Sequence, residues 1–134
     1  MFSIEGLMSK QVISSPNVPA AVGPYSQAIV ANGMVYTSGQ LGLVPATGQM
    51  VEGDVSAQTH QVFANLKALL EAAGSGLESV VKVNVYLQRM DDFGAMNAVY
   101  SQYFAVPYPA RSTVEVAQLP KNGLVEIEAV ALVK

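Results

Sequence analysis

The sequence predicts an α+β fold, with one sheet and two helices on one face. The expected elements follow the order β-β-β-α-β-α-β-β, in which strands and helices do not alternate regularly as they do in parallel α/β folds. A length of 134 residues fits one ordinary domain. No internal repeat, low-complexity tract or linker divides the chain. Because two helices cover only one face of a sheet, the other face is expected to be bare.

Three strands are expected in the first part of the chain, over residues 10–14, 27–31 and 34–38. The segment between the first two, SSPNVPAAVGPY, is rich in proline and glycine and is expected to be irregular. The second and third strands are joined by Asn32-Gly33, the strongest short-range signal for a hairpin. A loop broken by Pro45 and several glycines follows.

The clearest helix is expected over residues 56–74. Asp54 or Ser56 can cap its N-terminus, and Gly74 ends it. Side chains at i, i+3, i+4, i+7 spacing form one stripe that faces the core. The stripe consists of Thr59, Val62, Phe63, Leu66, Leu69, Leu70 and Ala73.

In the second half of the chain, a strand, a helix and two more strands are expected. Alternation with polar residues indicates a half-buried strand with inward-facing Val81, Val83, Val85 and Leu87. The Asp91-Asp92 pair favours a helix N-terminus. The helix ends before Pro107 and carries on one side Phe93, Met96, Tyr100 and Phe104. The last strands are expected over about 111–118 and 124–133, linked by LPKNG.

The composition points to self-association and argues against several function classes. The chain is 51% hydrophobic and only 13% charged, against roughly 25% charged in typical domains, so we expect apolar surface to be buried between subunits. A net charge of -3 and scattered lysines argue against nucleic-acid binding. Without cysteine and with one histidine, the chain offers no disulfide, zinc-thiolate or His-rich metal site. No glycine pattern for a nucleotide cofactor is present.

The chain is expected to be cytoplasmic and not membrane-bound. No apolar run approaches the ~18 residues that span a bilayer, and MFSIEGLMSK lacks the basic and apolar regions of a signal peptide. Residues 1–7 are interpreted as a tag remnant or an extended N-terminus before Met8. The domain is then 8–134.

Arg111 raises the main functional question, because burying an unpaired guanidinium is costly. Strand alternation places Arg111 with Thr113 on one face and Val114 with Val116 on the other. We expect the valines to face the helices, which puts Arg111 on the opposite, subunit-facing side. One interpretation is a structural salt bridge to Glu115 or Glu126. The other is a bidentate clamp on a small carboxylate.

Glu126 and Glu128 share one face of an otherwise apolar last strand. Either they lie at a solvated strand start, or one lines a pocket as a general acid or base. A simple hairpin of the last two strands would put Glu126 opposite residues near Val116, so local pairing does not join Glu126 to Arg111.

Four further polar residues are candidates for a site. Tyr25 in GPY and Ser38 in TSGQ are either ordinary turn-flanking residues or polar groups around a small substrate. His60, in mid-helix, is expected to be exposed, so no Ser-His-Asp triad can form. Asn97 is a helix-surface amide unless it faces a pocket.

Several motifs together resemble one known family, the Rid family, also called YjgF. They are GPYSQA, YTSGQLG, AAG, DDFGAMNAVY, PARSTVEVAQLPK and VEIEAVA, in order from about Met8 to Lys134. The resemblance implies a chorismate-mutase-like α+β domain that assembles as a homotrimer. Three sheets would form an inner barrel, with clefts at the subunit interfaces where Arg111 and Glu126 of different chains can meet.

The resemblance also implies an activity and site roles. Family members hydrolyse 2-imino acids, such as 2-iminopropanoate and 2-iminobutanoate, to 2-keto acids and ammonia, without cofactor or metal. Arg111 would grip the substrate carboxylate and Glu126 would polarise the attacking water. Tyr25 and Ser38 would line the cleft, with Asn97 nearby. Thr113 stands where the family often has cysteine, which places thiol-dependent behaviour in doubt.

Two alternatives remain open at this point. One is an endoribonuclease or translation inhibitor, an activity also attached to the family, against which the acidic charge counts. The other is a non-catalytic 2-keto-acid-binding regulator or chaperone that uses the same cleft. Glu126 discriminates, because a sensor tolerates Glu126→Gln whereas a hydrolase slows.

Overall fold

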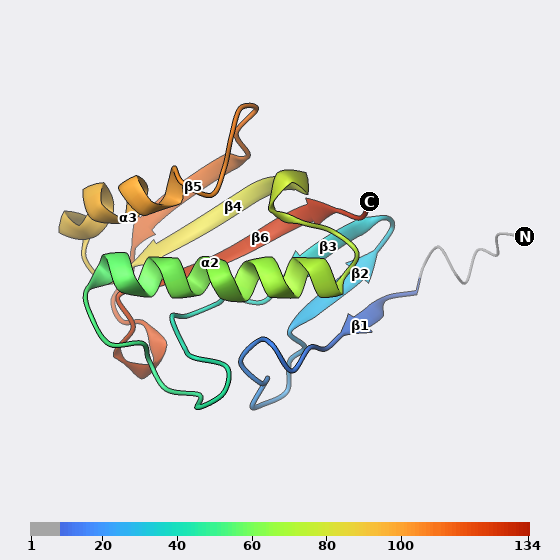
Figure 1. Ribbon diagram of the computed structural model, residues 1–134, viewed down its shortest axis with the longest axis horizontal. Helices are drawn as coiled ribbons and strands as arrows, with labels where there is room; N and C mark the ends of the chain where they lie inside the picture. The colour runs from blue at the N-terminus through green and yellow to red at the C-terminus, as the bar shows by residue number, and fades with distance from the viewer. Residues whose placement is uncertain (1–8) are drawn as a thin grey trace, which may run out of the picture.

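The computed structural model of the chain describes residues 9–134, which form one sheet packed against helices α2 and α3 (Figure 1). The predicted order β-β-β-α-β-α-β-β is confirmed. The interpretation of residues 1–7 lies outside the described residues. The elements are β1 (Gln11–Ile13), β2 (Ala28–Ala31), β3 (Met34–Thr37), α2 (Val55–Ala72), β4 (Val80–Leu87), α3 (Phe93–Tyr100), β5 (Ala110–Glu115) and β6 (Val125–Leu132), with short 3₁₀ turns at Leu77–Ser79 (η1), Met90–Asp92 (η2) and Pro120–Asn122 (η3).

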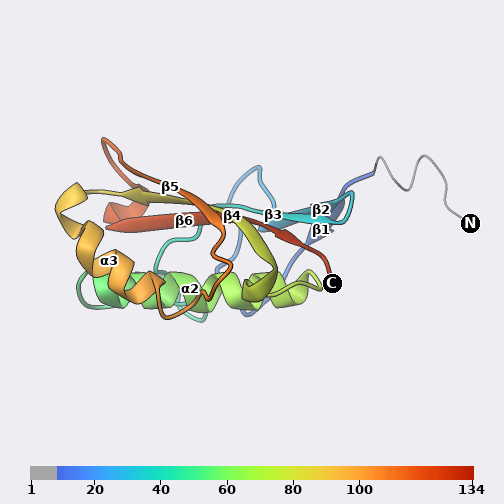
Figure 2. The same cartoon turned by 90° about the horizontal axis from the view of Figure 1, so that it is seen from above.

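The sheet has the strand order β1-β2-β3-β6-β4-β5. Neighbouring strands are antiparallel except β4 and β5, which are parallel. A parallel pair needs a crossover connection, and α3 supplies it. Both helices lie on the same side of the sheet (Figure 2), and the opposite face carries no helix of residues 9–134. The α+β prediction of one sheet with two helices on one face is therefore confirmed.

The hairpin between β2 and β3 forms where Asn32-Gly33 predicted it. Asn32 has φ 51° and Gly33 has φ 75°. A two-residue type I′ turn requires positive φ at both central positions, and its twist matches that of the flanking strands. Ala31 therefore pairs with Met34 across the turn.

Helix α2 forms as expected and supplies much of the core. Asp54 rather than Ser56 is the N-cap, since its carboxylate accepts a hydrogen bond from the Ala57 amide at 3.1 Å. Gly74, with φ 76°, ends the helix. All seven stripe residues are buried, none more than 8% exposed. No helix within residues 9–134 is long and apolar enough to cross a bilayer.

The first part of β4 differs from the prediction. Val83, Val85 and Leu87 are fully buried as expected, but Val81 is 39% exposed and Val80 is buried instead. The pairing of β4 with β6 shifts register between Val80 and Lys82. One extra residue reverses the alternation of a strand, so Val81 points away from the core.

Helix α3 is shorter than the predicted helix. A 3₁₀ turn over Met90–Asp92 precedes it, and the helix itself ends at Tyr100. Met96 and Tyr100 are buried as expected, and Phe93 packs against the core. Phe104 lies beyond the helix but still contacts the ring of Phe63, with 5.6 Å between the ring centroids.

The predicted facing of β5 is wrong. Arg111 pairs with Val83 and Thr113 with Val85, and those β4 side chains are buried beneath the helices. Arg111 and Thr113 therefore face the helices, whereas Val114 is 45% exposed on the opposite, helix-free face. The reason is that β5 is an edge strand covered by the polar and aromatic side of α3, which accepts a guanidinium.

The last two strands do not form the simple hairpin considered in the sequence. β4 lies between β5 and β6, so Glu126 pairs with Tyr86 of β4 rather than with a residue near Val116. The expectation that local pairing does not join Glu126 to Arg111 is nevertheless met.

Candidate active site

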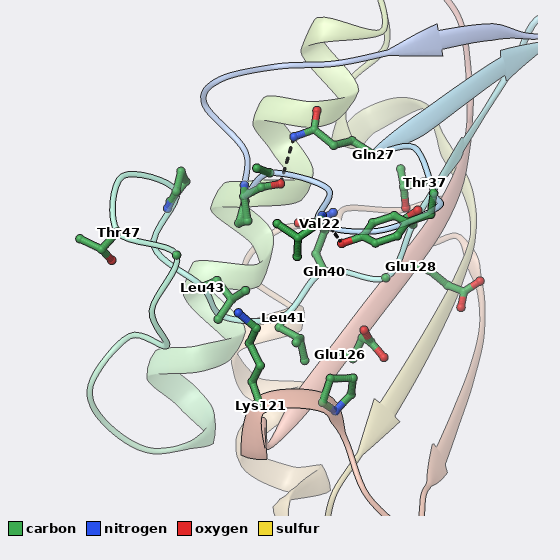
Figure 3. A pocket seen from close by; sticks show the side chains of 18 of the residues that line it. Val22, Gln27, Thr37, Gln40, Leu41, Leu43, Thr47, Lys121, Glu126 and Glu128 are labelled. Atoms are coloured by element: carbon green, nitrogen blue, oxygen red, sulfur yellow. Dashed lines mark hydrogen bonds between the residues drawn. The ribbon is translucent and has the colours of Figure 1, made fainter.

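The expected site residues fall into two groups, one on each face of the sheet. The first group lines an open cleft of about 860 Å³ near the start of β6 (Figure 3), which we call the Glu126 cleft. Its polar side chains include those of Tyr25, Ser38, Glu126 and Glu128. The second group lies between β5 and α3, around Arg111.

Glu126 occupies the second position of β6 and is half-buried on the helix-free face of the sheet. Burial raises the pKa of the Glu126 carboxyl group, and the neighbouring Glu128 carboxylate raises it further. Both effects disfavour the charged form. A carboxyl group whose pKa lies closer to neutral can accept a proton and return it within one reaction, as general acid–base catalysis requires.

Gly39 leaves room for this carboxyl group. A Cβ atom at Gly39 would lie 2.8 Å from both Cδ and Oε2 of Glu126, a distance that real Cβ atoms essentially never show. The approach is held by two backbone hydrogen bonds between neighbouring residues, Gln40 N to Ile127 O at 2.8 Å and Ile127 N to Gln40 O at 3.1 Å. From the sequence, the glycine of TSGQ is interpreted either as a turn residue or as a position that exposes a backbone amide to a substrate, and neither interpretation includes this contact with Glu126.

Tyr25 and Ser38 border the same cleft. Tyr25 is 52% exposed, and its hydroxyl oxygen accepts a long 3.4 Å hydrogen bond from the Val22 amide. The Ser38 hydroxyl donates to the Ser26 carbonyl at 2.6 Å. Its proton is engaged, so the oxygen remains free to accept a hydrogen bond from a ligand.

Gln27 holds the loop that carries Tyr25. Its side chain is buried, accepts a hydrogen bond from the Ser15 amide at 2.6 Å and donates to the Ser15 carbonyl at 3.1 Å. It also donates to the Pro19 carbonyl at 3.0 Å (Figure 3). A buried amide with its partners satisfied rigidifies the segment that surrounds it. This role could not be predicted from the sequence, because a glutamine at the start of a strand is ordinarily a surface residue.

A further wall of the Glu126 cleft contains Leu41, Leu43 and Lys121 (Figure 3). Asn65 of α2 supports this wall, since its amide donates to the Leu41 carbonyl at 3.2 Å and the Leu43 carbonyl at 2.9 Å. The cleft thus combines an apolar wall with carboxyl and hydroxyl groups, a common composition for small-molecule sites.

Arg111 lies between β5 and α3 and is held mainly by uncharged groups. Its Nη1 donates to Oδ1 of Asn97 at 2.7 Å. The guanidinium carbon lies 4.6 Å from the ring centroid of Tyr100 and 5.5 Å from that of Phe93, within cation–π range. No ion pair within residues 9–134 includes Arg111. The structural salt bridge to Glu115 or Glu126 is therefore not formed, and Asn97 is brought beside Arg111.

Two buried hydroxyl groups accompany Arg111. The hydroxyl oxygens of Thr113 and Tyr100 are buried and have no hydrogen-bond partner among the described residues. Burial raises the pKa of the Tyr100 hydroxyl, and the charge of Arg111 opposes that effect. Unpaired buried hydroxyls are costly, so the polar groups around Arg111 are not fully satisfied within one chain. Tyr100 was expected only as a core residue.

One chain does not bring the two groups together. Arg111 and Thr113 share the helix-covered face with Val83 and Val85, whereas Glu126 lies on the helix-free face. Neither Arg111 nor Asn97 lines the Glu126 cleft. One group therefore presents a cation without an ion-pair partner among residues 9–134, and the other presents a carboxyl group with a raised pKa.

The comparisons with known proteins agree with this architecture. A family model described as Endoribonuclease L-PSP matches residues 15–133. A protein of Dermatophagoides farinae named 2-iminobutanoate/2-iminopropanoate deaminase is 46% identical over 93% of this chain and 98% of its own length.

Two solved structures share the fold. A Rid family protein of Yersinia pestis superimposes with a TM-score of 0.91 and 46% identity, over 93% of this chain and all (100%) of its own. Escherichia coli TdcF, solved with bound serine, has a TM-score of 0.86 and 40% identity, over 91% of this chain and 98% of its own. The chain therefore belongs to the L-PSP family, the Rid or YjgF family that its motifs resemble, which includes relatives named imine deaminases.

Proposed function

We propose that the protein hydrolyses reactive 2-imino acids, such as 2-iminopropanoate and 2-iminobutanoate, to 2-keto acids and ammonia. The main support is the environment of Arg111. This permanent cation has one hydrogen bond to Asn97 and no carboxylate partner among residues 9–134. Its remaining donors suit the two oxygens of a small carboxylate. The relative named for this activity and the relative solved with serine, itself a small amino acid, support the substrate class.

The reaction needs orientation and one proton carrier. Arg111 would hold the substrate carboxylate, with Asn97 keeping the guanidinium in place. Glu126 would take a proton from water as the oxygen attacks the imine carbon and pass it to the imine nitrogen, which gives an amino alcohol. It would then take the hydroxyl proton and pass it to the same nitrogen as the carbon–nitrogen bond breaks. Ammonia leaves and the carbonyl forms. Tyr25 and Ser38 would orient the substrate, and no cofactor or metal is required.

We propose further that the chain forms a homotrimer with its sites at the subunit interfaces. The opposite placement of Arg111 and Glu126 supports this assembly, because a neighbouring copy can supply the group that each chain lacks. The helix-free face also exposes apolar side chains, among them Tyr36 at 48%, Val114 at 45% and Leu132 at 49%. A second copy would remove them from water.

A coupled assay tests the activity. An amino-acid oxidase generates the imine in situ, and hydrolysis is followed with the wild type, Arg111→Ala and Glu126→Gln. We expect Arg111→Ala to abolish turnover above the spontaneous rate without changing the oligomeric mass, because Arg111 makes no ion pair that the fold depends on. Turnover by Arg111→Ala at the wild-type rate would refute the carboxylate clamp.

Subunit mixing tests the shared site. Arg111→Ala and Glu126→Gln are unfolded together and refolded at equal concentrations. In a symmetric trimer whose sites combine two chains, about one quarter of the sites regain both groups. Sites confined to single chains would regain none, and that result would overturn the interface assignment.

The same variants separate the alternatives. A regulator that only binds 2-keto acids keeps its affinity in Glu126→Gln and shows no turnover in the wild type. An endoribonuclease cleaves RNA, and cleavage that survives in Arg111→Ala would show that RNA is not handled by this site. The net charge of -3 counts against RNA as a substrate.

A further inference from the structure

We propose that Glu128, anchored by the Tyr86 hydroxyl, is a positioning residue that controls when Glu126 gains and loses its proton. The inference rests on the proposed function and deepens it, since it gives roles to two residues that the expected mechanism does not use.

The geometry joins the three side chains. Glu126 and Glu128 stand two residues apart on β6 and share the helix-free face. Tyr86 is the β4 partner of Glu126, and Asn84 is the partner of Glu128. The Tyr86 hydroxyl nevertheless donates to Oε1 of Glu128 at 2.8 Å. Tyr86 thus reaches diagonally from the position opposite Glu126 and ties the neighbouring carboxylate in place.

The bond to Tyr86 fixes the position of the Glu128 carboxylate. The same bond, with burial, raises the pKa of Tyr86, so the hydroxyl keeps its proton and remains the donor. An anchored carboxylate, unlike a freely rotating one, exerts a constant field on its neighbour.

The other titratable groups around Glu126 do not replace this effect. Apart from Glu128 and Tyr86, the described groups that face it are Tyr25 and Lys121, which line the cleft from loops. Lys121 forms no ion pair with Glu126 within residues 9–134 and would act in the opposite sense. Arg111 of the same chain lies on the other face of the sheet, and the Arg111 that a neighbouring copy brings to the cleft in the proposed trimer is the same in the wild type and in every variant compared. Glu128 is therefore the negative charge that disfavours ionisation of Glu126, in addition to burial.

The consequence concerns base strength. Glu126 must be ionised to accept a proton from water, and it must be basic enough to do so. Removing the charge of Glu128 lowers the pKa of Glu126, which leaves more of the ionised form at acidic pH but makes it a weaker base. Activity should then persist to lower pH, while the rate on the neutral plateau falls.

The first measurement is the pH profile of kcat/KM for the wild type, Glu128→Gln and Tyr86→Phe. We expect the acidic limb of Glu128→Gln to move to lower pH with a lower plateau. Tyr86→Phe should move it in the same direction by less, because the charge remains but loses its anchor. Glu128→Asp restores the charge and should return the limb toward the wild-type position. The matched control is Glu71→Gln, which removes an exposed carboxylate from α2 on the other side of the sheet and should leave the limb unchanged.

The second measurement does not depend on activity. The carboxyl ¹³C resonance of Glu126 is titrated by NMR in the intact protein without substrate, for the same variants. We expect its midpoint to fall in Glu128→Gln and in Tyr86→Phe. An unchanged midpoint in both would overturn the inference even in an active enzyme. If the midpoint falls in the variants but the wild type hydrolyses no imine, the proposed function is refuted. The influence of Glu128 on Glu126 is then still supported. Tyr86→Phe removes only a hydroxyl, so it carries the test if Glu128→Gln fails to fold.

Discussion

Gly39→Ala offers a direct test of the Glu126 cleft. A Cβ atom at this position would lie 2.8 Å from the Glu126 carboxyl group, and ordinary contacts begin at 3.4 Å. The carboxyl group must therefore move by at least about 0.6 Å, and displacements near 1 Å at a reacting group can cost roughly a hundred-fold in rate. We expect a ten- to hundred-fold lower kcat/KM, about 1.4–2.8 kcal/mol of transition-state stabilisation.

The fold should tolerate the same change. The φ of Gly39 lies outside the left-handed region, so alanine can adopt this backbone conformation without strain. Alanine also lowers the conformational entropy of the unfolded chain. The oxidase-coupled assay measures kcat/KM, and thermal unfolding checks stability. Gly94→Ala is the matched control, because nothing lies within 4 Å of its added Cβ. Gly94 is the second residue of α3, so the change should raise stability by less than the roughly 1 kcal/mol of a helix interior. A wild-type kcat/KM in Gly39→Ala would show that the position of the Glu126 carboxyl group does not limit the reaction.

Four further changes have defined outcomes. Asn97→Ala removes a 2.7 Å hydrogen bond to Arg111 and, since bonds to charged groups contribute about 1.5–3 kcal/mol, KM should rise roughly ten- to hundred-fold; an unchanged KM would mean that Arg111 needs no support. Thr113→Val replaces an unpaired buried hydroxyl and should hold or raise the melting temperature, while a higher KM would show that the hydroxyl contacts substrate. The pKa of Glu126 is raised in the folded state, so the folded protein binds more protons and its stability falls as pH rises through that pKa. Glu126→Gln should therefore unfold at a higher temperature than the wild type at neutral pH, and the difference should disappear at acidic pH. Leu66→Ala creates a cavity at a side chain that is 1% exposed and should lower the free energy of unfolding, measured by urea titration, by about 2–5 kcal/mol. The control Lys67→Ala, at the neighbouring exposed residue, should change the free energy of unfolding little.

The sequence was enough to predict the elements that depend on interactions between neighbouring residues. Asn32-Gly33 forms its turn because both residues tolerate positive φ, and the residues from Thr59 to Ala73 share a stripe because a helix repeats every 3.6 residues. The family motifs likewise named Arg111 and Glu126 from residue identity alone. The fold class followed because the order of elements limits how they can pack.

Long-range pairing decided what the sequence could not. Val81 and Val83 look equivalent in the chain, but a register shift against β6 exposes the first and buries the second. The two strands at the end of the chain looked like a hairpin, but β4 lies between them. Neither the register shift nor the position of β4 between β5 and β6 can be recognised from the residues next to it in the sequence.

The site shows the same division. The sequence by itself determined which side chains bring a cation, a carboxyl group and hydroxyls to this protein. Only the tertiary structure decided that Arg111 faces α3 while Glu126 faces away from both helices, and that Gly39, Gln27 and Tyr86 support the cleft. The physical reason is that alternation along a strand separates its two faces but does not say which face is covered. That choice depends on the helix and strand that pack alongside, and these come from distant parts of the chain.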